Sequence, residues 1–340
     1  NLSIGSIDVN IMTKVDKTNF HKNKELSVEY NDAHAALRGF AKSNLESSVI
    51  FSAGMNPRLY GYISNFEDFY PNIKGEIKKK IVLKVSDYRS AIIQGKFLAK
   101  KGLWVSEYRI ESGLNCGGHA FATDGLLMGP ILDEFRENRE ALINQNFEVL
   151  VNSLTKLNRV VPKEKLKIKI TAQGGVGTSD EQEFLINHYD LDSVGWGTPF
   201  LLVPEVTTVD HSTRNKLIHA KEEDLYLSKV SPLGVPFNNL RNNSKDNERD
   251  QKISEGKPGS SCPRRFLALS KEYDKQGICS ASRKFQKIKI NESEKNYFSL
   301  DKVFEKTCLC VGLSAPAIIN NEIDIKDSKA VSICPGPNLA

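Results

Sequence analysis

Two glycine-rich segments are the first candidates for chemistry in this chain of 340 residues. They are Thr171-Ala-Gln-Gly-Gly-Val-Gly-Thr178 and Val194-Gly-Trp-Gly-Thr-Pro-Phe200. Each follows an apolar run of strand type, where glycine lets the backbone approach a ligand closely. A helix is predicted to begin at Ser179, followed by Asp180, and its first turn would offer unpaired N–H groups to an anion. The two turns therefore predict a phosphate-binding cup, with two ordinary tight turns as the alternative.

One histidine stands out from the other five. His119 ends the segment Ser112-Gly-Leu-Asn-Cys-Gly-Gly-His119, which follows another apolar run. The two glycines leave room for a flat ring, and imidazole titrates near neutral pH, which suits proton transfer to or from a carbon acid. We expect His119 to be a catalytic base and Cys116 only to line the pocket. The remaining histidines are interpreted as structural: His21, His34, His188, His211 and His219.

Five of the six cysteines lie in the C-terminal part of the chain: Cys262, Cys279, Cys308, Cys310 and Cys334. Proline follows the first and the last of them, and Cys308-Leu-Cys310 forms a close pair. These features are compatible with an iron–sulfur cluster or a tetrahedral zinc site. The spacing matches neither a ferredoxin nor a paired zinc ribbon, so buried cysteines without metal are the alternative.

Repeated strand–helix units must position these residues. Six apolar runs have strand character: Ile7–Met12, Val49–Ala53, Ile81–Val85, Leu103–Tyr108, Ile168–Ala172 and Ser193–Trp196. Helical pattern lies between them over Asp32–Ser43, Tyr88–Lys101, Pro130–Leu157 and Ser179–Tyr189. The alternation predicts an α/β fold with a parallel sheet. A (β/α)8 TIM barrel needs eight such units, so we expect a barrel that lacks its first two in this chain, which begins with Asn.

The chain divides near residue 243. The polar stretch Arg241–Gly259 is interpreted as a linker or mobile loop. We expect residues 1–243 to form the barrel domain and residues 244–340 to form the linker and a cysteine-rich C-terminal module.

Composition excludes several classes of function. Lys+Arg of 47 against Asp+Glu of 42 gives a net charge of +5, and 39% of the residues are hydrophobic. The basic clusters are interleaved with acids, so we expect no nucleic-acid partner. No run of strictly apolar residues is long enough to span a bilayer, and no signal peptide is evident. We expect a cytoplasmic protein with a small-molecule substrate, and a homo-oligomer or an electron-transfer partner stays open.

Five segments taken in order resemble the nitronate monooxygenase (2-nitropropane dioxygenase) family of FMN-dependent TIM barrels, which is related to flavin enoyl reductases. The first is Asp8-Val-Asn-Ile-Met12, followed by Asn-Cys-Gly-Gly-His119, Ala-Gln-Gly-Gly-Val-Gly177, Val-Gly-Trp-Gly-Thr-Pro-Phe200 and the region from Asp-Leu-Tyr-Leu-Ser228 to Asn242. The resemblance covers about residues 4–243 and makes the six runs strands three to eight. Each motif is weak alone, and their shared order is the stronger signal.

The resemblance implies roles for individual residues. It places Asn10 near the flavin, lets Lys84 face the flavin and makes His119 the catalytic base. It assigns the flavin phosphate to the two glycine turns, with these cofactor-binding residues: Gln173, Gly174, Gly175, Gly197 and Thr198. The chain also departs from the family pattern at Ser112, Cys116, Trp196 and Pro199, which leaves the specific substrate open.

The function that the resemblance implies is an FMN-dependent oxidoreductase of nitronates or nitroalkanes with a histidine base. An iron–sulfur cluster in the C-terminal module could relay electrons to the flavin. One alternative is a flavin-dependent enoyl or keto reductase fed by NAD(P)H or by such a relay. Another is a non-catalytic accessory subunit that binds flavin or phosphate.

Overall fold

The described part of the chain forms two compact units. A computed structural model describes residues 5–52, 54–111, 128–174, 176–234, 236–296, 299–324 and 328–335. The first unit contains the described residues up to 173 together with 178–195, and the second contains 174, 176, 177 and those from Trp196 onward. Residues 196–243, which the sequence analysis grouped with the barrel, thus belong to the second unit.

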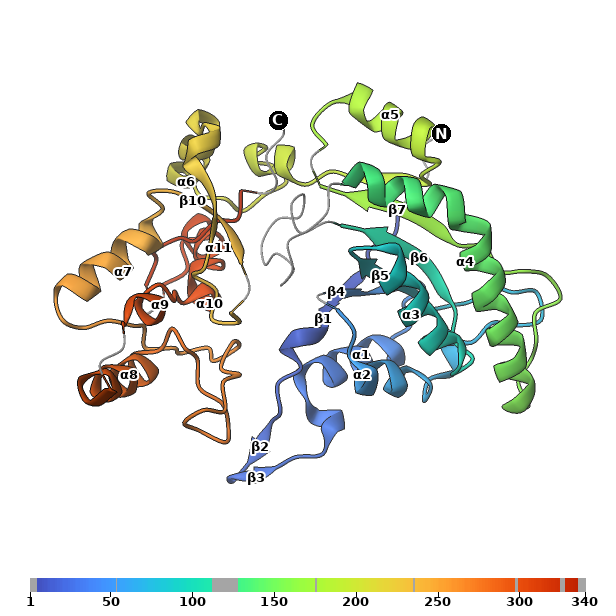
Figure 1. Ribbon diagram of the computed structural model, residues 1–340, viewed down its shortest axis with the longest axis horizontal. Coiled ribbons are helices and arrows are strands. Elements are labelled where there is room, and N and C mark those ends of the chain that lie inside the picture. The colour runs from blue at the N-terminus through green and yellow to red at the C-terminus, as the bar shows by residue number, and fades with distance from the viewer. Residues whose placement is uncertain are drawn as a thin grey trace. The chain divides into compact units, whose positions relative to one another are not determined.

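A six-stranded parallel sheet organises the first unit (Figure 1). Its strands are β1 (Val9–Met12), β4 (Ser48–Ser52), β5 (Lys80–Val85), β6 (Val105–Ile110), β7 (Lys169–Gln173) and β8 (Ser193–Gly195). Their order in the sheet is their order in the chain, which confirms the predicted parallel arrangement. The order shows no reversal of the kind that marks a doubly wound fold. β1 and β8 are the two edges of this sheet, so closure into a barrel stays a prediction.

One α-helix follows each of the first five strands of the sheet: α1 (Asp32–Lys42), α2 (Pro57–Ile63), α3 (Tyr88–Ala99), α4 (Met128–Lys156) and α5 (Ser179–Tyr189). The N-cap side chain of Asp87 accepts a hydrogen bond from the Ser90 backbone N–H at 2.6 Å, which starts α3. The four predicted helices are confirmed within two residues at each end, and α2 was not predicted. Short elements complete the unit: η1 (Thr13–Val15), β2 (Phe20–His21), β3 (Lys24–Glu25), η2 (Val28–Tyr30) and η3 (Glu67–Phe69).

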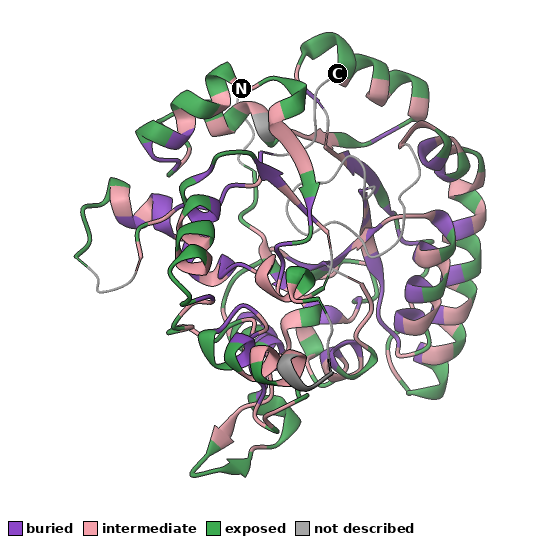
Figure 2. Ribbon diagram, turned by 60° about the vertical axis from the view of Figure 1, so that its left-hand side comes forward, coloured by how far each residue is buried: buried purple, intermediate pink, exposed green. Residues whose placement is uncertain are grey.

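The helices cover one face of the sheet, and the main apolar core lies between them. Alternate residues of a strand point to opposite faces, so every second strand residue enters this core. On β5 these are Ile81, Leu83 and Val85, each at most 1% exposed. Figure 2 shows buried residues along the central strands of the sheet and on the sheet-facing sides of the helices. Each such side chain stabilises the fold by roughly 1.5–3 kcal/mol relative to an exposed position.

The second unit has a different construction. It contains η4 (Thr198–Leu202), α6 (His211–His219), η5 (Glu222–Asp224), β9 (Leu225–Ser228), β10 (Phe237–Leu240), α7 (Ser244–Ser254), α8 (Arg283–Asn296), α9 (Asp301–Phe304), α10 (Leu309–Gly312) and α11 (Ala315–Asn320). β9 and β10 pair antiparallel. Its buried apolar residues form three small clusters, centred on Val209 and Leu240, on Val230 and Phe237, and on Ala268 with Cys279. No extended sheet organises the described residues of this unit.

The prediction of a linker over Arg241–Gly259 was wrong, because α7 occupies most of it. Asn243 caps the helix by accepting a hydrogen bond from the Asp246 N–H at 2.9 Å. Along the helix, Glu248 accepts from Lys245 and Lys252, three residues before it and four after it. These local ion pairs stabilise a helix that has little apolar periodicity, which is why the polar composition suggested a loop.

One stretch of the described residues is apolar and long enough to cross a membrane, judged by length and composition alone. It runs from Asp301 to Asn320. In the structure this stretch is divided into the three short helices α9, α10 and α11. A membrane span needs one continuous helix of about 20 residues, so the division argues against a span in this conformation.

Candidate functional site

The face of the sheet that the helices leave uncovered carries most of the polar strand residues. Its side chains alternate with those of the apolar core, so the core residues Leu83 and Val85 flank Lys84 on β5. We call this surface the polar face. It includes Asn10, Ser52, Lys84, Glu107, Arg109, Thr171 and Gln173. Three predicted site residues, Asn10, Lys84 and Gln173, therefore share one face of one sheet.

An ion pair stands at the carboxyl ends of β5 and β6. The Lys84 ammonium contacts the carboxylate of Glu111, which directly follows β6. The Glu111 side chain is 3% exposed and that of Lys84 is 18% exposed. The contact with the Lys84 ammonium offsets part of the hydration that the Glu111 carboxylate loses on burial. The pair thereby fixes a positive charge at the strand end where parallel α/β proteins bind ligands.

A second polar network links β6 to β7. Glu107 Oε1 accepts a hydrogen bond from Thr171 Oγ1 at 2.7 Å. The same oxygen accepts from Arg109 Nε and Nη2, both at 2.8 Å. Thr171 is 4% exposed, so this cluster is partly desolvated. Charge-assisted hydrogen bonds of this kind hold side chains in defined positions.

Asn10 and Gln173 are also positioned by their neighbours. The Ser52 hydroxyl donates to Asn10 Oδ1 at 2.9 Å, which orients the amide of Asn10. Gln173, the last residue of β7, lies over Gly195 of β8, because a Cβ at Gly195 would come within 2.9 Å of Gln173 Cγ. Glycine at 195 therefore makes room for the glutamine side chain.

The predicted phosphate cup is described only in part. Gly174 has φ +104°, a conformation that glycine adopts without strain and that other residues rarely adopt. A Cβ added to Gly197 would meet no atom within 4 Å. Gly174 and Gly197 belong to the second unit, whereas Gln173 belongs to the first. Gly175, the side chain of Thr198 and the whole of His119 lie outside the described residues.

The N-terminus of α5 offers fewer free donors than we expected. The Thr178 hydroxyl accepts the Glu181 N–H at 3.3 Å, and the Glu181 carboxylate accepts the Thr178 N–H at 2.9 Å. This capping box satisfies two backbone donors, and Asp180 adds negative charge to the first turn. Both features disfavour an anion at this helix, so the glycine backbone would have to bind the phosphate.

The described residues contain no group of three or more His, Cys, Asp or Glu side chains arranged to hold a metal ion. The predicted metal site at Cys262, Cys279, Cys308, Cys310 and Cys334 is therefore not confirmed. Instead four of these thiols pair, Cys262 with Cys279 and Cys308 with Cys310. The hydrogen bond from Cys279 lowers the pKa of Cys262, with burial acting in the opposite direction. The same bond raises the pKa of Cys279, and burial raises it further.

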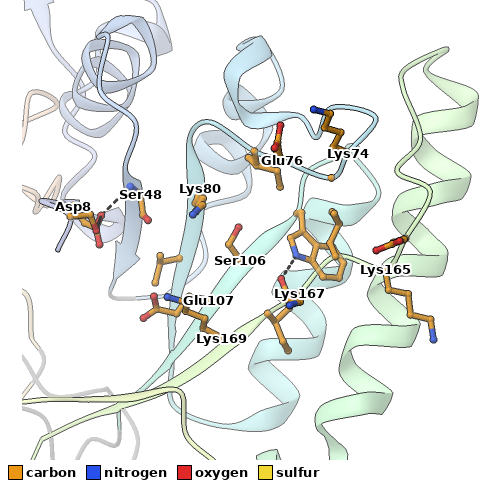
Figure 3. Close-up of a pocket in the computed structure, with 18 residues that line it drawn as sticks. Asp8, Ser48, Lys74, Glu76, Lys80, Ser106, Glu107, Lys165, Lys167 and Lys169 are labelled. Atoms are coloured by element: carbon orange, nitrogen blue, oxygen red, sulfur yellow. Dashed lines mark hydrogen bonds between the residues drawn. The ribbon is translucent and has the colours of Figure 1, made fainter. Parts of the chain in front are cut away.

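The first unit has a pocket of about 550 Å³ (Figure 3), and none of the predicted site residues Asn10, Lys84 and Gln173 lines it. It is lined by the first residues of three strands, Ser48, Lys80 and Lys169. Ligands of parallel α/β proteins bind at the carboxyl ends of the strands, whereas this pocket lies at the amino ends. Its lysines alternate with acids such as Glu76 and Glu107, so it does not present a uniform charge.

Sequence reasoning missed the charged partners of the polar face, which are Glu107, Arg109 and Glu111. Their signal was present as three charged residues at alternate positions, the first in the predicted strand Leu103–Tyr108 and the other two just beyond its predicted end. In a half-buried strand this period places all three on one face. By contrast, the expectation for His34 is supported, because its buried ring lies against Asp16 at 2.8 Å.

The fold and the site define an α/β protein whose parallel sheet has one apolar and one polar face. No family model and no curated protein matches the chain. It is similar to a nitroalkane oxidase from Streptomyces ansochromogenes, with 12% identity and a TM-score of 0.36 over 63% of this chain and 50% of the oxidase. It is also similar to the enoyl reductase domain of MlnA from the macrolactin biosynthesis cluster of Bacillus amyloliquefaciens, with 14% identity and a TM-score of 0.48 over 95% and 71% of the two chains.

The chain spans half the length of the nitroalkane oxidase. Both TM-scores are too low for either similarity to establish the fold or the activity of this chain.

Proposed function

We propose that this protein is an FMN-dependent oxidoreductase that oxidises nitronates and nitroalkanes. The main support for the proposal is that three residues lie on the same face of the sheet. Either the family resemblance or its glycine motif assigns each of these residues to the flavin site. Asn10, Lys84 and Gln173 come from three strands, and all lie on the polar face. Parallel sheets usually pack apolar residues on both faces, so a charged and hydrogen-bonded face favours a ligand-binding role.

The chemistry of these side chains fits the polar edge of a flavin ring. Lys84 donates hydrogen bonds and carries a positive charge, and Asn10 and Gln173 can each donate and accept. Bound FMN would supply the redox chemistry by taking two electrons from the substrate and passing them to oxygen or another acceptor. Glu111 holds the Lys84 ammonium in place, so that its charge can stabilise negative charge on a neighbouring group.

His119 is proposed as the base for neutral substrates. It would take the α-proton of a nitroalkane and leave a nitronate, whereas a substrate that is already ionised needs no such transfer. The resemblance and the two glycines before His119 support this role. Because the residue lies outside the described part of the chain, the role depends on a direct test.

The first experiment asks whether the full chain binds FMN. The purified protein is expected to show a flavin absorbance spectrum and to release FMN, not FAD, on denaturation. Anaerobic addition of a nitronate should bleach the spectrum. A colourless protein that takes up no FMN would overturn the proposal and favour an accessory subunit. Bleaching by NAD(P)H together with turnover of an unsaturated acyl substrate, and none by nitronate, would favour a reductase.

The second experiment tests the proton transfer. His119→Asn should keep FMN bound and slow oxidation of a neutral nitroalkane by roughly two to four orders of magnitude, the usual contribution of a general base. Oxidation of the pre-ionised nitronate should change little. His211→Asn, at the start of α6, is the matched control and should keep both rates. An unchanged rate with the neutral substrate in His119→Asn would remove this residue from the mechanism.

A further inference from the structure

Cys262 and Cys279 are brought together in the second unit, in a region that the proposed flavin chemistry does not use. The segment 260–270 crosses the segment 278–283 twice, with backbone hydrogen bonds of 2.8–3.1 Å at each crossing. Cys279 belongs to a small apolar cluster against which Cys262 packs, and both thiols line the same small pocket. The fold therefore holds two thiols in contact although 16 residues separate them in the chain.

Two glycines make these crossings possible. Gly259 has φ +83°, and a Cβ there would lie 2.7 Å from the backbone of Arg283. Gly277 has φ +88°, and a Cβ there would lie 2.2 Å from the carbonyl oxygen of Ala268. Backbone atoms cannot yield to a side chain as a flexible group can, so both positions require glycine. The two glycines therefore allow the backbones of the two segments to approach each other closely.

The two thiols differ in their access to solvent. Cys279 is 3% exposed and lies among alanine side chains. Cys262 is half-buried, and both cysteines line a pocket of about 230 Å³ together with Arg265, Lys284 and Asp274. A small reagent that enters the pocket therefore meets the more exposed of the two thiols, Cys262, more readily than the buried Cys279.

The backbone at Cys262 is strained. Its φ is +55°, in the left-handed region, and Pro263 follows it. A residue before proline prefers an extended conformation, and a non-glycine residue rarely has positive φ. Strain of this kind is concentrated at functional positions, where the surrounding structure holds it.

We propose that Cys262 and Cys279 are a peroxide-reactive thiol pair that closes into a reversible disulfide. The Cys262 thiolate attacks one oxygen of a hydroperoxide, so that an S–O bond forms, the O–O bond breaks, and an alcohol or water leaves with a solvent proton. The Cys279 sulfur then attacks the Cys262 sulfenic acid. An S–S bond forms, the S–O bond breaks, and the hydroxide leaves as water with the proton of Cys279. A dithiol reductant reverses the oxidation by thiol–disulfide exchange.

The second thiol pair provides an internal control. Cys308 and Cys310 are two residues apart in the chain and interact electrostatically with each other, and Cys308 also interacts with Cys262. Cys308 is only 3% exposed, Cys310 is half-buried like Cys262, and neither Cys308 nor Cys310 lines the pocket of Cys262. Because Cys262 is both partly exposed and next to a pocket, we expect it to react with peroxide before Cys308 or Cys310.

The test uses the full chain, reduced and then freed of reductant. Treatment with one equivalent of hydrogen peroxide should lower the free thiols from six towards four, and dithiothreitol should restore them. Peptide mapping should find the Cys262–Cys279 disulfide. Cys279→Ser should stop at a sulfenic acid on Cys262 that dimedone traps, and Cys262→Ser should abolish the disulfide. Cys308→Ser should still form it.

Three results would overturn the proposal. One is a first disulfide between Cys308 and Cys310, and another is no loss of thiols in the wild-type chain. The third is stoichiometric iron or zinc in the purified protein that is lost in Cys262→Ser, because metal ligation would then be the role of these thiols. The wild-type measurements decide the question even if a variant does not fold.

Discussion

The two faces of the sheet in the first unit come from the same strands but have opposite chemistry. On the helix-covered face, residues such as Phe51 and Leu83 are at most 1% exposed and touch other apolar side chains. On the polar face, Lys84 and Glu107 lie in ion pairs and hydrogen bonds. The apolar face accounts for why the unit folds, since its burial supplies the main stabilising free energy.

The polar face adds little of this stabilisation, because placing charges in partly buried positions costs hydration that their partners only offset. A network of partly buried charges that adds so little stability is expected where the charges contact a bound ligand. Residues that hold the fold and residues that we propose to serve a site thus lie on opposite faces of the sheet, and substitutions on the two faces should distinguish the two roles experimentally.

The largest effect on stability is expected on the helix-covered face. Phe51→Ala should lower the free energy of unfolding by about 3–5 kcal/mol, because it removes a fully buried ring and leaves a cavity. The chain has two tryptophans, so in a Trp196→Phe background the buried Trp104 reports unfolding of the first unit by fluorescence in urea. A loss below 1 kcal/mol would mean that this face is not the main core.

The next effect concerns the ion pair of the polar face. Lys84→Met should cost about 2–3 kcal/mol in the same assay, because it leaves the Glu111 carboxylate buried without its cation. The double variant Lys84→Met, Glu111→Leu should recover most of that loss and should bind FMN more weakly than the wild type. Lys80→Met, at the exposed start of the same strand, is the control and should change stability by less than about 0.5 kcal/mol. Additive losses in the double variant would show that the two side chains are not coupled.

A smaller effect is expected for a single hydrogen bond between strands. Thr171→Val keeps the shape of the side chain and removes the donor to Glu107. Hydrogen bonds to charged groups contribute about 1.5–3 kcal/mol, and we expect the lower end because Arg109 still donates to the same oxygen. Urea unfolding of this variant, read from Trp104, measures the loss. Stability equal to the wild type would show that Arg109 alone satisfies Glu107.

The smallest effect is expected at the strand edge. Gly195→Ala should cost about 1 kcal/mol or less, because the flexible end of Gln173 can move away from the new methyl group. The same change should weaken FMN binding more than it weakens folding, since Gln173 is displaced from the polar face. Equal FMN affinity, measured by fluorescence titration, would remove Gln173 from the cofactor site.

The sequence alone was sufficient for the six strands of the parallel sheet and for four of the five α-helices of the first unit. β5 was predicted within one residue, and α5 was predicted with its bounds, because local apolar periodicity and capping residues determine such elements. The shared face of Asn10, Lys84 and Gln173 could also have been predicted from alternation along the strands. The helix α7 was missed, because side-chain ion pairs stabilise it and composition does not reveal them.

Only the tertiary structure decided which polar residues meet. Glu107 and Thr171 are 64 residues apart in the chain, and they bond because β6 and β7 are neighbours in the sheet. Lys84 and Glu111 meet for the same reason, at the ends of β5 and β6. The contact of Cys262 with Cys279 likewise depends on two backbone crossings that no spacing rule predicts. Sequence determines local conformation through nearest-neighbour sterics and periodicity, whereas pairing between distant residues depends on how the elements pack.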